Sequence, residues 1–268
     1  MNIDLPLILV LASAITGFIW LFDSLFFAAK RKAAGKDKEP LILEYSKSFF
    51  PVIFIVLLLR SFIVEPFRIP SGSMMPTLLV GDFILVNKFA YGIRLPVLDN
   101  KIIDVDDPQR GDVFVFRYPQ NPDIDYIKRV VAVPGDVVDY RNKVLYVNGE
   151  AQTGTLIGEY IGEGGGARET GSIEHLENLT GVEHKILTNP MAPNLPPGCR
   201  VLNRGPIKIP QGAYFAMGDN RDNSNDSRCW GLVPEENLVG EAFAIWMHWD
   251  SQRDGFPIAW SRLGSTIN

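Results

Sequence analysis

The chain has 268 residues, a formal net charge of −5 and a pI near 5.3. This acidic balance argues against the basic surface that nucleic-acid-binding proteins carry, so we expect no nucleic acid as a partner. The two cysteines, Cys199 and Cys229, form no zinc-ligand pattern, so no metal and no cofactor is predicted. Whether the two cysteines pair is left open by the sequence.

Residues 5–27 are predicted to form a first transmembrane helix. Leu5 to Phe22 is an unbroken run of apolar or small residues, and with residues 25–29 it is long enough to cross about 30 Å of hydrocarbon. A cleavable signal peptide is the alternative. It is disfavoured because no Lys or Arg precedes the run.

Residues 28–48 form a short basic loop. Its charged residues are Lys30, Arg31, Lys32, Lys36, Lys38 and Lys47 against Asp37, Glu39 and Glu44. The positive-inside rule places this loop in the cytoplasm and the N-terminus outside. Residues 49–64 are then predicted to return the chain as a second transmembrane helix, with a buried soluble helix as the alternative for this shorter run.

Residues 65–149 and 201–268 are predicted to form one mainly β domain of folded antiparallel sheet. Short runs rich in Val, Ile, Phe and Tyr alternate with turn residues, as is typical of strands. The runs are 83–90, 113–118, 125–133, 144–147, 213–217 and 242–249. Asn148-Gly149 predicts a tight hairpin. Residues 150–200, rich in Gly and Pro, are predicted to be a smaller inserted β-rich cap.

The loop from Pro70 to Leu78 carries the candidate nucleophile. Ser71 and Ser73 stand two residues apart beside Gly72, in a loop that prolines stiffen at both ends. A rigid, exposed loop is a setting in which a serine hydroxyl can act as a nucleophile. A plain turn after a membrane helix is the alternative.

Histidine is a poor candidate for the base that such a serine needs. His175 and His184 lie in the loose insertion, and His248 lies in the last strand. None of the three has the setting of a known triad, so a Ser-His-Asp triad is disfavoured.

Lysine is the other candidate base. Lys128 interrupts an otherwise mostly apolar strand, where alternation places Tyr126 and Lys128 on one face and Ile127 and Arg129 on the other. A desolvated lysine can be a neutral amine near neutral pH and accept a proton. A lysine that protects a sheet edge is the alternative.

Residues 218–228 form a dense polar loop. An EF-hand calcium site is rejected because Ser227 and Val233 stand where that motif needs Gly and Glu. We expect a network of paired charges that fixes a neighbouring catalytic geometry, with a solvated loop as the alternative. The charges are Asp219, Arg221, Asp226 and Arg228.

Together these segments resemble bacterial signal peptidase I, a family of membrane-bound serine proteases that remove signal peptides from exported proteins. The matching boxes are residues 70–78, 81–82, 126–129 with 134–136, and 218–231, in the family's order. The resemblance covers essentially the whole chain and is weakest in residues 150–200. One departure is Cys229, which stands where the family often has an aromatic residue.

By position, the resemblance implies a Ser-Lys dyad without a metal or a catalytic histidine. Ser73 would be the nucleophile and Lys128 the general base. The Ser71 hydroxyl and the backbone N–H of Ser73 would form the oxyanion hole, and Ser224 would orient the lysine amine. Asp219, Arg221, Asp226 and Arg228 would support the site. Shallow pockets for an Ala-x-Ala sequence would be lined by Ile69, Met74, Leu78, Ile84, Val115, Tyr126 and Ile127.

The resemblance also implies partners and a location. Substrates would be signal-peptide-bearing preproteins, and no obligate protein partner is expected. The enzyme would sit in the bacterial inner membrane with its N-terminus and catalytic domain in the periplasm, and Phe67 and Phe83 would rest on membrane lipid. Two alternatives are a self-cleaving repressor-type Ser-Lys protease, which would carry a DNA-binding domain instead of spans, and a membrane-anchored β domain for adhesion or assembly.

Overall fold

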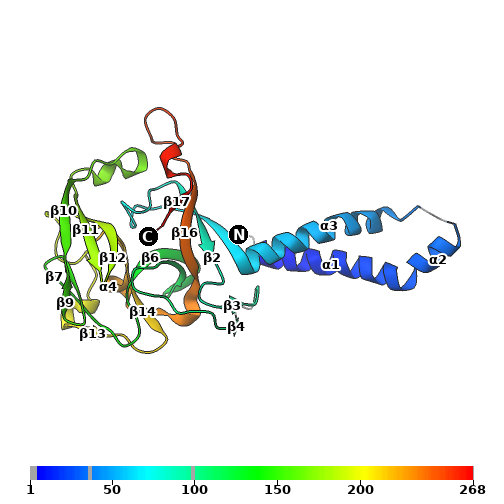
Figure 1. Ribbon diagram of the computed structural model, residues 1–268, viewed down its shortest axis with the longest axis horizontal. Helices are drawn as coiled ribbons and strands as arrows, with labels where there is room; N and C mark the ends of the chain where they lie inside the picture. The colour runs from blue at the N-terminus through cyan, green and yellow to red at the C-terminus, as the bar shows by residue number, and fades with distance from the viewer. Residues whose placement is uncertain (1–4, 36–37, 98–99, 268) are drawn as a thin grey trace. The chain divides into compact units, whose positions relative to one another are not determined.

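The computed structural model describes residues 5–35, 38–97 and 100–267 (Figure 1). The chain divides into two compact units, residues 1–65 with 92–104, and residues 66–91 with 105–268. Residues 1–4, which bear on the predicted position of the N-terminus, lie outside the described residues, as do Lys36 and Asp37 of the predicted basic loop.

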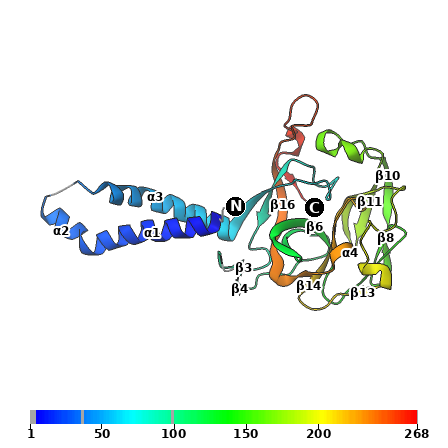
Figure 2. The ribbon, with the colours of Figure 1, turned by 180° about the vertical axis from the view of Figure 1, so that it is seen from behind.

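The first unit consists mainly of two long apolar helices. They are α1 (Leu5–Phe26) and α3 (Leu41–Leu58), which continues as a π-helical segment to Ile63, with the short α2 (Ala28–Ala33) between them. Figures 1 and 2 show α1 and α3 side by side. Both are long and apolar enough to cross a membrane, and most of their large apolar side chains are exposed rather than buried in a core. This exposure fits helices that face lipid.

The second helix begins at Leu41, eight residues before the predicted start at residue 49. Its first turns carry charged residues, which an apolar run alone does not detect. The helix begins here because the N–H groups of Leu43 and Glu44 donate to the Pro40 carbonyl, at 2.9 and 3.1 Å. Lys47 also pairs with Glu39 at 2.5 Å. From Leu41 to Ile63 the helical segment has 23 residues, which is long enough to cross a membrane, whereas the predicted run of residues 49–64 is short for a span. The unit also holds the strand pair β3 (Ile93–Arg94) and β4 (Lys101–Ile103).

The largest sheet among the described residues has eight strands. In order these are β1 (Val64–Arg68), β2 (Asp82–Asn87), β16 (Leu238–His248), β5 (Val113–Tyr118), β6 (Asn121–Ala132), β14 (Ala213–Met217) and β15 (Val233–Pro234), with β17 (Ser265–Thr266) beside β16. The pairs that β16 forms with β2, β5 and β17 are antiparallel, and so are those of β6 with β5 and β14. The prediction of a mainly β fold with antiparallel sheets and two N-terminal apolar helices is confirmed.

Two smaller sheets lie on the other side of the second unit from β16 (Figures 1 and 2). One contains β13 (Ile207–Lys208), β7 (Val137–Arg141), β8 (Val144–Val147) and β9 (Glu150–Gln152), and the other contains β10 (Gly154–Glu159), β11 (Ile173–Leu179) and β12 (Val182–Thr188). Short helical turns occur at Gly164–Glu169, Val201–Arg204, Ser227–Trp230 (α4), Glu235–Asn237 and Trp260–Arg262.

The Asn148-Gly149 turn joins β8 to β9 as predicted. Both residues have positive φ, 55° and 83°, which is the backbone of a type I′ hairpin. Asn142 and Lys143 form a second such turn between β7 and β8, with φ of 51° and 63°. The sequence does not predict this turn, because Lys143 stands at the second turn position, where type I′ hairpins usually have glycine. Contacts of Lys143 with Asn194 and Asp222 hold the conformation.

Two clusters of buried side chains pack on opposite faces of β6. The Met74 cluster comprises Ile69, Met74, Leu78, Ile84, Val86, Val113, Val115, Ala242 and Ile245. The Phe116 cluster comprises Tyr91, Phe114, Phe116, Val130, Tyr214, Ala216, Val233 and Leu238. Ile127 packs against the first cluster and Tyr126 against the second, as strand alternation predicts. Strand β6 therefore fixes the direction of every side chain along residues 126–130.

The tight corner at Gly81 gives a test of the fold. Gly81 has φ of +93°, and a Cβ there would lie 2.3 Å from the backbone oxygen of Trp249. Gly135 has nearly the same φ, +94°, but open space around it. We expect Gly135→Ala to cost about 1–3 kcal/mol for backbone strain alone, and Gly81→Ala to cost clearly more. Thermal unfolding of the full chain in detergent measures both, and equal losses would contradict the assigned packing.

Candidate active site

Lys128 and Ser73, which are 55 residues apart in sequence, meet in the structure. The Lys128 Nζ atom lies 2.6 Å from Ser73 Oγ and also donates to the carbonyl of Ile127 at 2.8 Å. Lys128 is only 4% exposed, whereas Ser73 is half-buried. The amine is thus held beside a hydroxyl that solvent or a ligand can still approach.

Burial determines the charge of this lysine. Removal from water disfavours the ammonium form and lowers the pKa of Lys128 to about 8, although the nearby Asp226 and Asp219 carboxylates act in the opposite direction. No ion pair between Lys128 and a carboxylate forms within residues 5–35, 38–97 and 100–267. A substantial fraction of the amine is therefore neutral slightly above neutral pH, with Nζ at hydrogen-bond distance from Ser73 Oγ.

The backbone around Ser73 is clamped by the polar loop of residues 218–228. Asn220 donates from its backbone N–H to the Ser73 carbonyl and from Nδ2 to the Gly72 carbonyl, both at 3.1 Å. Met74, next to the serine, is fully buried in its cluster. Gly218 is required at this contact, since a Cβ on it would lie 2.4 Å from the Ser73 carbonyl oxygen. The position of the hydroxyl is thus set by fixed backbone.

Arg129 binds this same loop from the opposite face of β6. Its guanidinium makes two hydrogen bonds to the Asp219 carboxylate, at 2.9 and 2.7 Å, and both side chains are fully buried. Thr77, from the serine loop, donates to Asp219 at 2.6 Å. Burial alone would raise the pKa of Asp219, but the charge of Arg129 keeps it below its usual value. Asp219 therefore remains ionised and ties the serine loop to the lysine strand.

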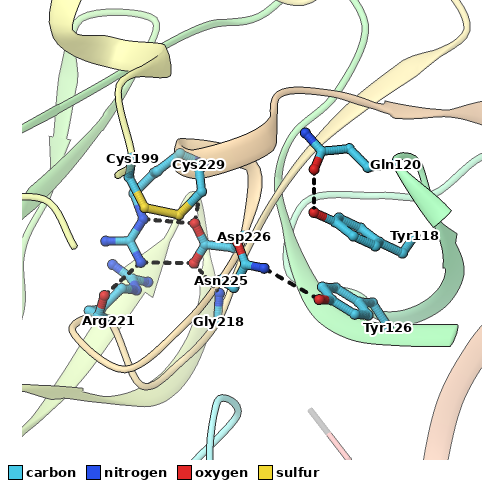
Figure 3. The surroundings of a disulfide bond; sticks show 10 residues. Tyr118, Gln120, Tyr126, Cys199, Gly218, Arg221, Asn225, Asp226 and Cys229 are labelled. Carbon is cyan, nitrogen blue, oxygen red and sulfur yellow. Dashed lines mark hydrogen bonds and ion pairs between the residues drawn. A yellow bond between two sulfur atoms is a disulfide. The ribbon is translucent and has the colours of Figure 1, made fainter. Parts of the chain in front are cut away.

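Two further buried ion pairs complete the network. Arg221 forms two hydrogen bonds with Glu177 of β11, at 2.8 and 2.5 Å, and Arg228 forms two with Asp226, at 2.9 and 2.8 Å. Figure 3 shows the Asp226 pair, with the second guanidinium nitrogen also donating to the Arg221 carbonyl at 2.6 Å. His184 adds its Nε2 atom 3.2 Å from Glu177. Such pairs cost much free energy if one partner is removed, because the other charge is left buried.

The predicted supporting charges are thus all buried and paired, but only one of the pairs joins two members of the predicted set. Asp226 pairs with Arg228, whereas Asp219 and Arg221 take Arg129 and Glu177 as partners. Arg129, Glu177, Thr77, Asn220 and His184 had not been selected as site residues. For Arg129 the sequence held a usable signal, since a charge inside an apolar strand next to a candidate base requires a partner.

The cap contributes to this site directly. Strand β12 exchanges two backbone hydrogen bonds with the polar loop, from Leu187 N–H to Asp219 and from Arg221 N–H back to Leu187, both at 2.9 Å. Glu177 and His184 come from the same three-stranded sheet. The inserted cap that composition predicts thus also holds the polar loop in place, which local composition does not show because the pairing is long-range.

Ser224 and Ser71 form no hydrogen bond with Lys128 or Ser73 among the described residues. Ser224 is 5% exposed and lies beside Gly218, but its hydroxyl has no hydrogen bond of normal geometry to any described residue, although it helps to lower the pKa of Asp226. The amine of Lys128 is instead oriented by the Ile127 carbonyl. Ser71 is exposed at the edge of the loop.

The predicted pocket residues divide into two groups. Ile69, Met74, Leu78, Ile84 and Val115 are at most 2% exposed and all belong to the Met74 cluster. Only Tyr126 and Ile127 keep an exposed fraction. The first group therefore forms the floor beneath the serine loop, and the second group is available for contact.

Among the described residues, none of the three histidines forms a hydrogen bond with the Ser73 hydroxyl. His248 contacts the Asp82 carboxylate at 2.8 Å, His175 contacts Thr188, and His184 lies in the charge network.

The two cysteines form a disulfide, which joins the segment before Val201 to α4 (Figure 3). This answers the question that the sequence left open.

Known proteins resemble this chain over nearly its whole length. A family model described as "Signal peptidase, peptidase S26" matches residues 42–249. Two proteins named Signal peptidase I are similar to this chain: that from Pseudomonas aeruginosa is 51% identical and that from Pseudomonas fluorescens is 50% identical. Each alignment covers 98% of this chain and 99% of the relative. A protein of the same name from Aquifex aeolicus is 40% identical over 74% of this chain and 81% of its own length.

The buried amine makes a prediction about stability. Below pH 8 Lys128 is charged in both the folded and the unfolded chain, so folding bears the full cost of burying the charge. The cost fades between pH 8 and 10.5, where the folded amine is neutral. We expect Lys128→Met to raise the free energy of unfolding at pH 6 by at most about 3 kcal/mol, and to lose this gain by pH 10.5.

Denaturation of the full chain in detergent at both pH values measures the effect. The control is Lys185→Met, which removes an exposed lysine of β12 and should show no comparable change with pH. A gain in stability of equal size at pH 6 and 10.5 would mean that hydrophobic packing, and not the buried charge, explains the result.

Proposed function

The chain belongs to the signal peptidase family, peptidase S26, and we propose that it cleaves N-terminal signal peptides from exported preproteins with Ser73 as nucleophile and Lys128 as general base. The observation that carries the assignment is the 2.6 Å approach of the Lys128 amine to the Ser73 hydroxyl in surroundings that lower the lysine pKa to about 8. A base is most effective when its pKa lies near the working pH.

The reaction proceeds by acyl transfer. Neutral Lys128 accepts the Ser73 proton as the oxygen attacks the scissile carbonyl, and the resulting ammonium protonates the leaving amine. The signal peptide remains as an ester on Ser73. Lys128, neutral again, accepts a proton from water, which attacks the ester and releases the signal peptide with Ser73 restored.

The oxyanion of each tetrahedral intermediate needs donors. We assign these to the backbone N–H of Ser73 and the hydroxyl of Ser71, which is exposed two residues before the nucleophile and can turn toward a bound substrate. One such donor is typically worth about 2.7–4 kcal/mol in the transition state.

Specificity for small residues before the cut follows from the apolar floor of the site. The Met74 cluster is buried beneath the serine loop, and its members are at most a few per cent exposed. Residues of the Ala-x-Ala type fit above this floor and against Tyr126 and Ile127. Larger side chains require the floor to open, which packed cores resist.

The two apolar helices anchor the enzyme in a membrane. We propose the bacterial inner membrane, with the basic loop in the cytoplasm and both the N-terminus and the catalytic unit in the periplasm. Ten residues separate Ile63 from Ser73, so the chain can place the nucleophile at most about 35 Å from the end of the second helix. Phe67 and Phe83 are half-buried, and Phe83 contacts the exposed Trp246, which suits contact with membrane lipid.

The dyad is tested by activity. We expect Ser73→Ala and Lys128→Ala to lower the cleavage rate of a preprotein in detergent by at least about a thousandfold. In the unmodified enzyme kcat/KM should rise roughly a hundredfold from pH 6 to 9, as the amine loses its proton. Exposed residues of the same unit provide controls, and Ser251→Ala and Lys185→Ala should behave as wild type.

Wild-type cleavage by either dyad variant would refute this assignment. It is also the outcome that a membrane-anchored adhesion or assembly domain predicts. A flat pH profile with an inactive Lys128→Ala variant would leave Ser73 as nucleophile and exclude the lysine as base.

Topology has its own test. Trypsin added to inside-out membrane vesicles should cut the loop that contains Lys30 and Lys32, because these vesicles expose the cytoplasmic face. The same loop should be protected in right-side-out vesicles. The reverse pattern would invert the proposed orientation.

A further inference from the structure

A second surface feature adjoins the dyad. A groove of about 520 Å³ runs between the turn after β5 and the segment that precedes Cys199. Tyr118 and Gln120 form one wall, Pro196 and Cys199 form the other, and Ser224 and Asn225 lie between them. All these residues belong to the second unit.

An aromatic pair lies between the groove and the dyad. Figure 3 shows the Tyr118 and Tyr126 rings, which stack with their centroids 4.4 Å apart. The Lys128 amine lies 5.5 Å from the centroid of Tyr126. Asn225 donates from Nδ2 to the Tyr126 hydroxyl at 3.3 Å. A ligand that extends from the dyad past Tyr126 reaches Tyr118 at the wall of the groove.

Ser224 provides a second connection. A Cβ on Gly218 would lie 2.3 Å from Ser224 Oγ and 2.4 Å from the Ser73 carbonyl oxygen, so both atoms flank one small space. The Ser224 hydroxyl is nine-tenths buried, lines the groove and lacks a hydrogen bond of normal geometry to the described residues. A buried hydroxyl in this state has donor and acceptor capacity for a ligand.

The groove has the chemistry of a receptor for neutral peptide. Gln120 uses Oε1 to accept from Tyr118, which leaves its NH₂ group to donate, and Asn225 uses Nδ2 on Tyr126, which leaves its carbonyl to accept. The one charged lining residue is Asp222, and Lys143 pairs with it at 2.7 Å. A peptide backbone offers the complementary donor and acceptor.

The direction of the groove identifies its occupant. The two halves of a bound substrate leave the scissile bond in opposite directions. The residues before the cut are assigned above to the floor formed by the Met74 cluster and to contact with Tyr126 and Ile127. The groove lies beyond Tyr126, because its wall residue Tyr118 stacks on the Tyr126 ring, on the face of β6 where the Phe116 cluster packs.

We propose that this groove binds the first residues of the mature protein, those just after the scissile bond, as an extended segment held through its backbone by Gln120, Ser224 and Asn225. The inference rests on the proposed function. It adds a binding site for the part of the substrate that is released. The Cys199–Cys229 disulfide fixes one wall of the site, because it joins the segment that precedes it to α4.

Two peptide substrates test the proposal. Both carry the same signal-peptide sequence, and one ends a single residue after the cut whereas the other continues for six. We expect wild type to cleave the longer peptide with a kcat/KM about tenfold higher, the effect of one or two hydrogen bonds to the released part. The gain should appear mainly as a lower KM, as for binding that is equal in ground and transition states.

Removal of the groove contacts should abolish this preference. In Gln120→Ala with Asn225→Ala, the two peptides should be cleaved at similar rates, with the short peptide as fast as in wild type. The control is Gln211→Ala, an exposed glutamine outside the groove, which should keep the preference. Single Gln120→Ala leaves the Asn225 bond to Tyr126 intact and should show part of the loss.

Three outcomes would overturn the inference: equal cleavage of both peptides by wild type, an undiminished preference in the double variant, or equal slowing of both peptides in it. Failure of the proposed function looks different, because neither peptide would then be cut in a way that depends on Ser73.

Discussion

Exclusion of water from one amine is the constraint on which the rest of the second unit depends. Lys128 can act as a base near neutral pH only if its charge is disfavoured, so no carboxylate is allowed to pair with it. The surrounding charges are satisfied elsewhere: Arg129 holds Asp219, and Arg228 holds Asp226. The two carboxylates thus lie close enough to shape the site, but each forms its ion pair with an arginine and not with Lys128.

Much of the fold was predictable because it depends on local rules. Runs rich in Val, Ile, Phe and Tyr located six strands, β2, β5, β6, β8, β14 and β16, and Asn148-Gly149 marked its hairpin. The ion-pair partners were not predictable, since Arg129 and Asp219 are 90 residues apart and only the sheet order brings them together. The start of the second helix at Leu41 was missed because an apolar run does not include the charged turns before it.

The candidate site shows the same division between local and long-range information. Ser73 and Lys128 were recognised from their boxes, and the structure brings them into contact. The resemblance assigns Ser224 to the lysine, and in the structure its buried hydroxyl lines the groove without a hydrogen bond of normal geometry to a described residue. The cap illustrates the limit best, because its loose composition conceals Glu177 and the β12 bonds that hold the polar loop in place.

The clamp between Asn220 and the Ser73 carbonyl joins residues that are far apart in the order of synthesis. A ribosome completes the serine loop and the lysine strand well before it makes the segment that immobilises them. A growing chain therefore carries both reactive groups without the frame that aligns them. On the proposed mechanism, cleavage therefore requires the last third of the polypeptide to be made and folded.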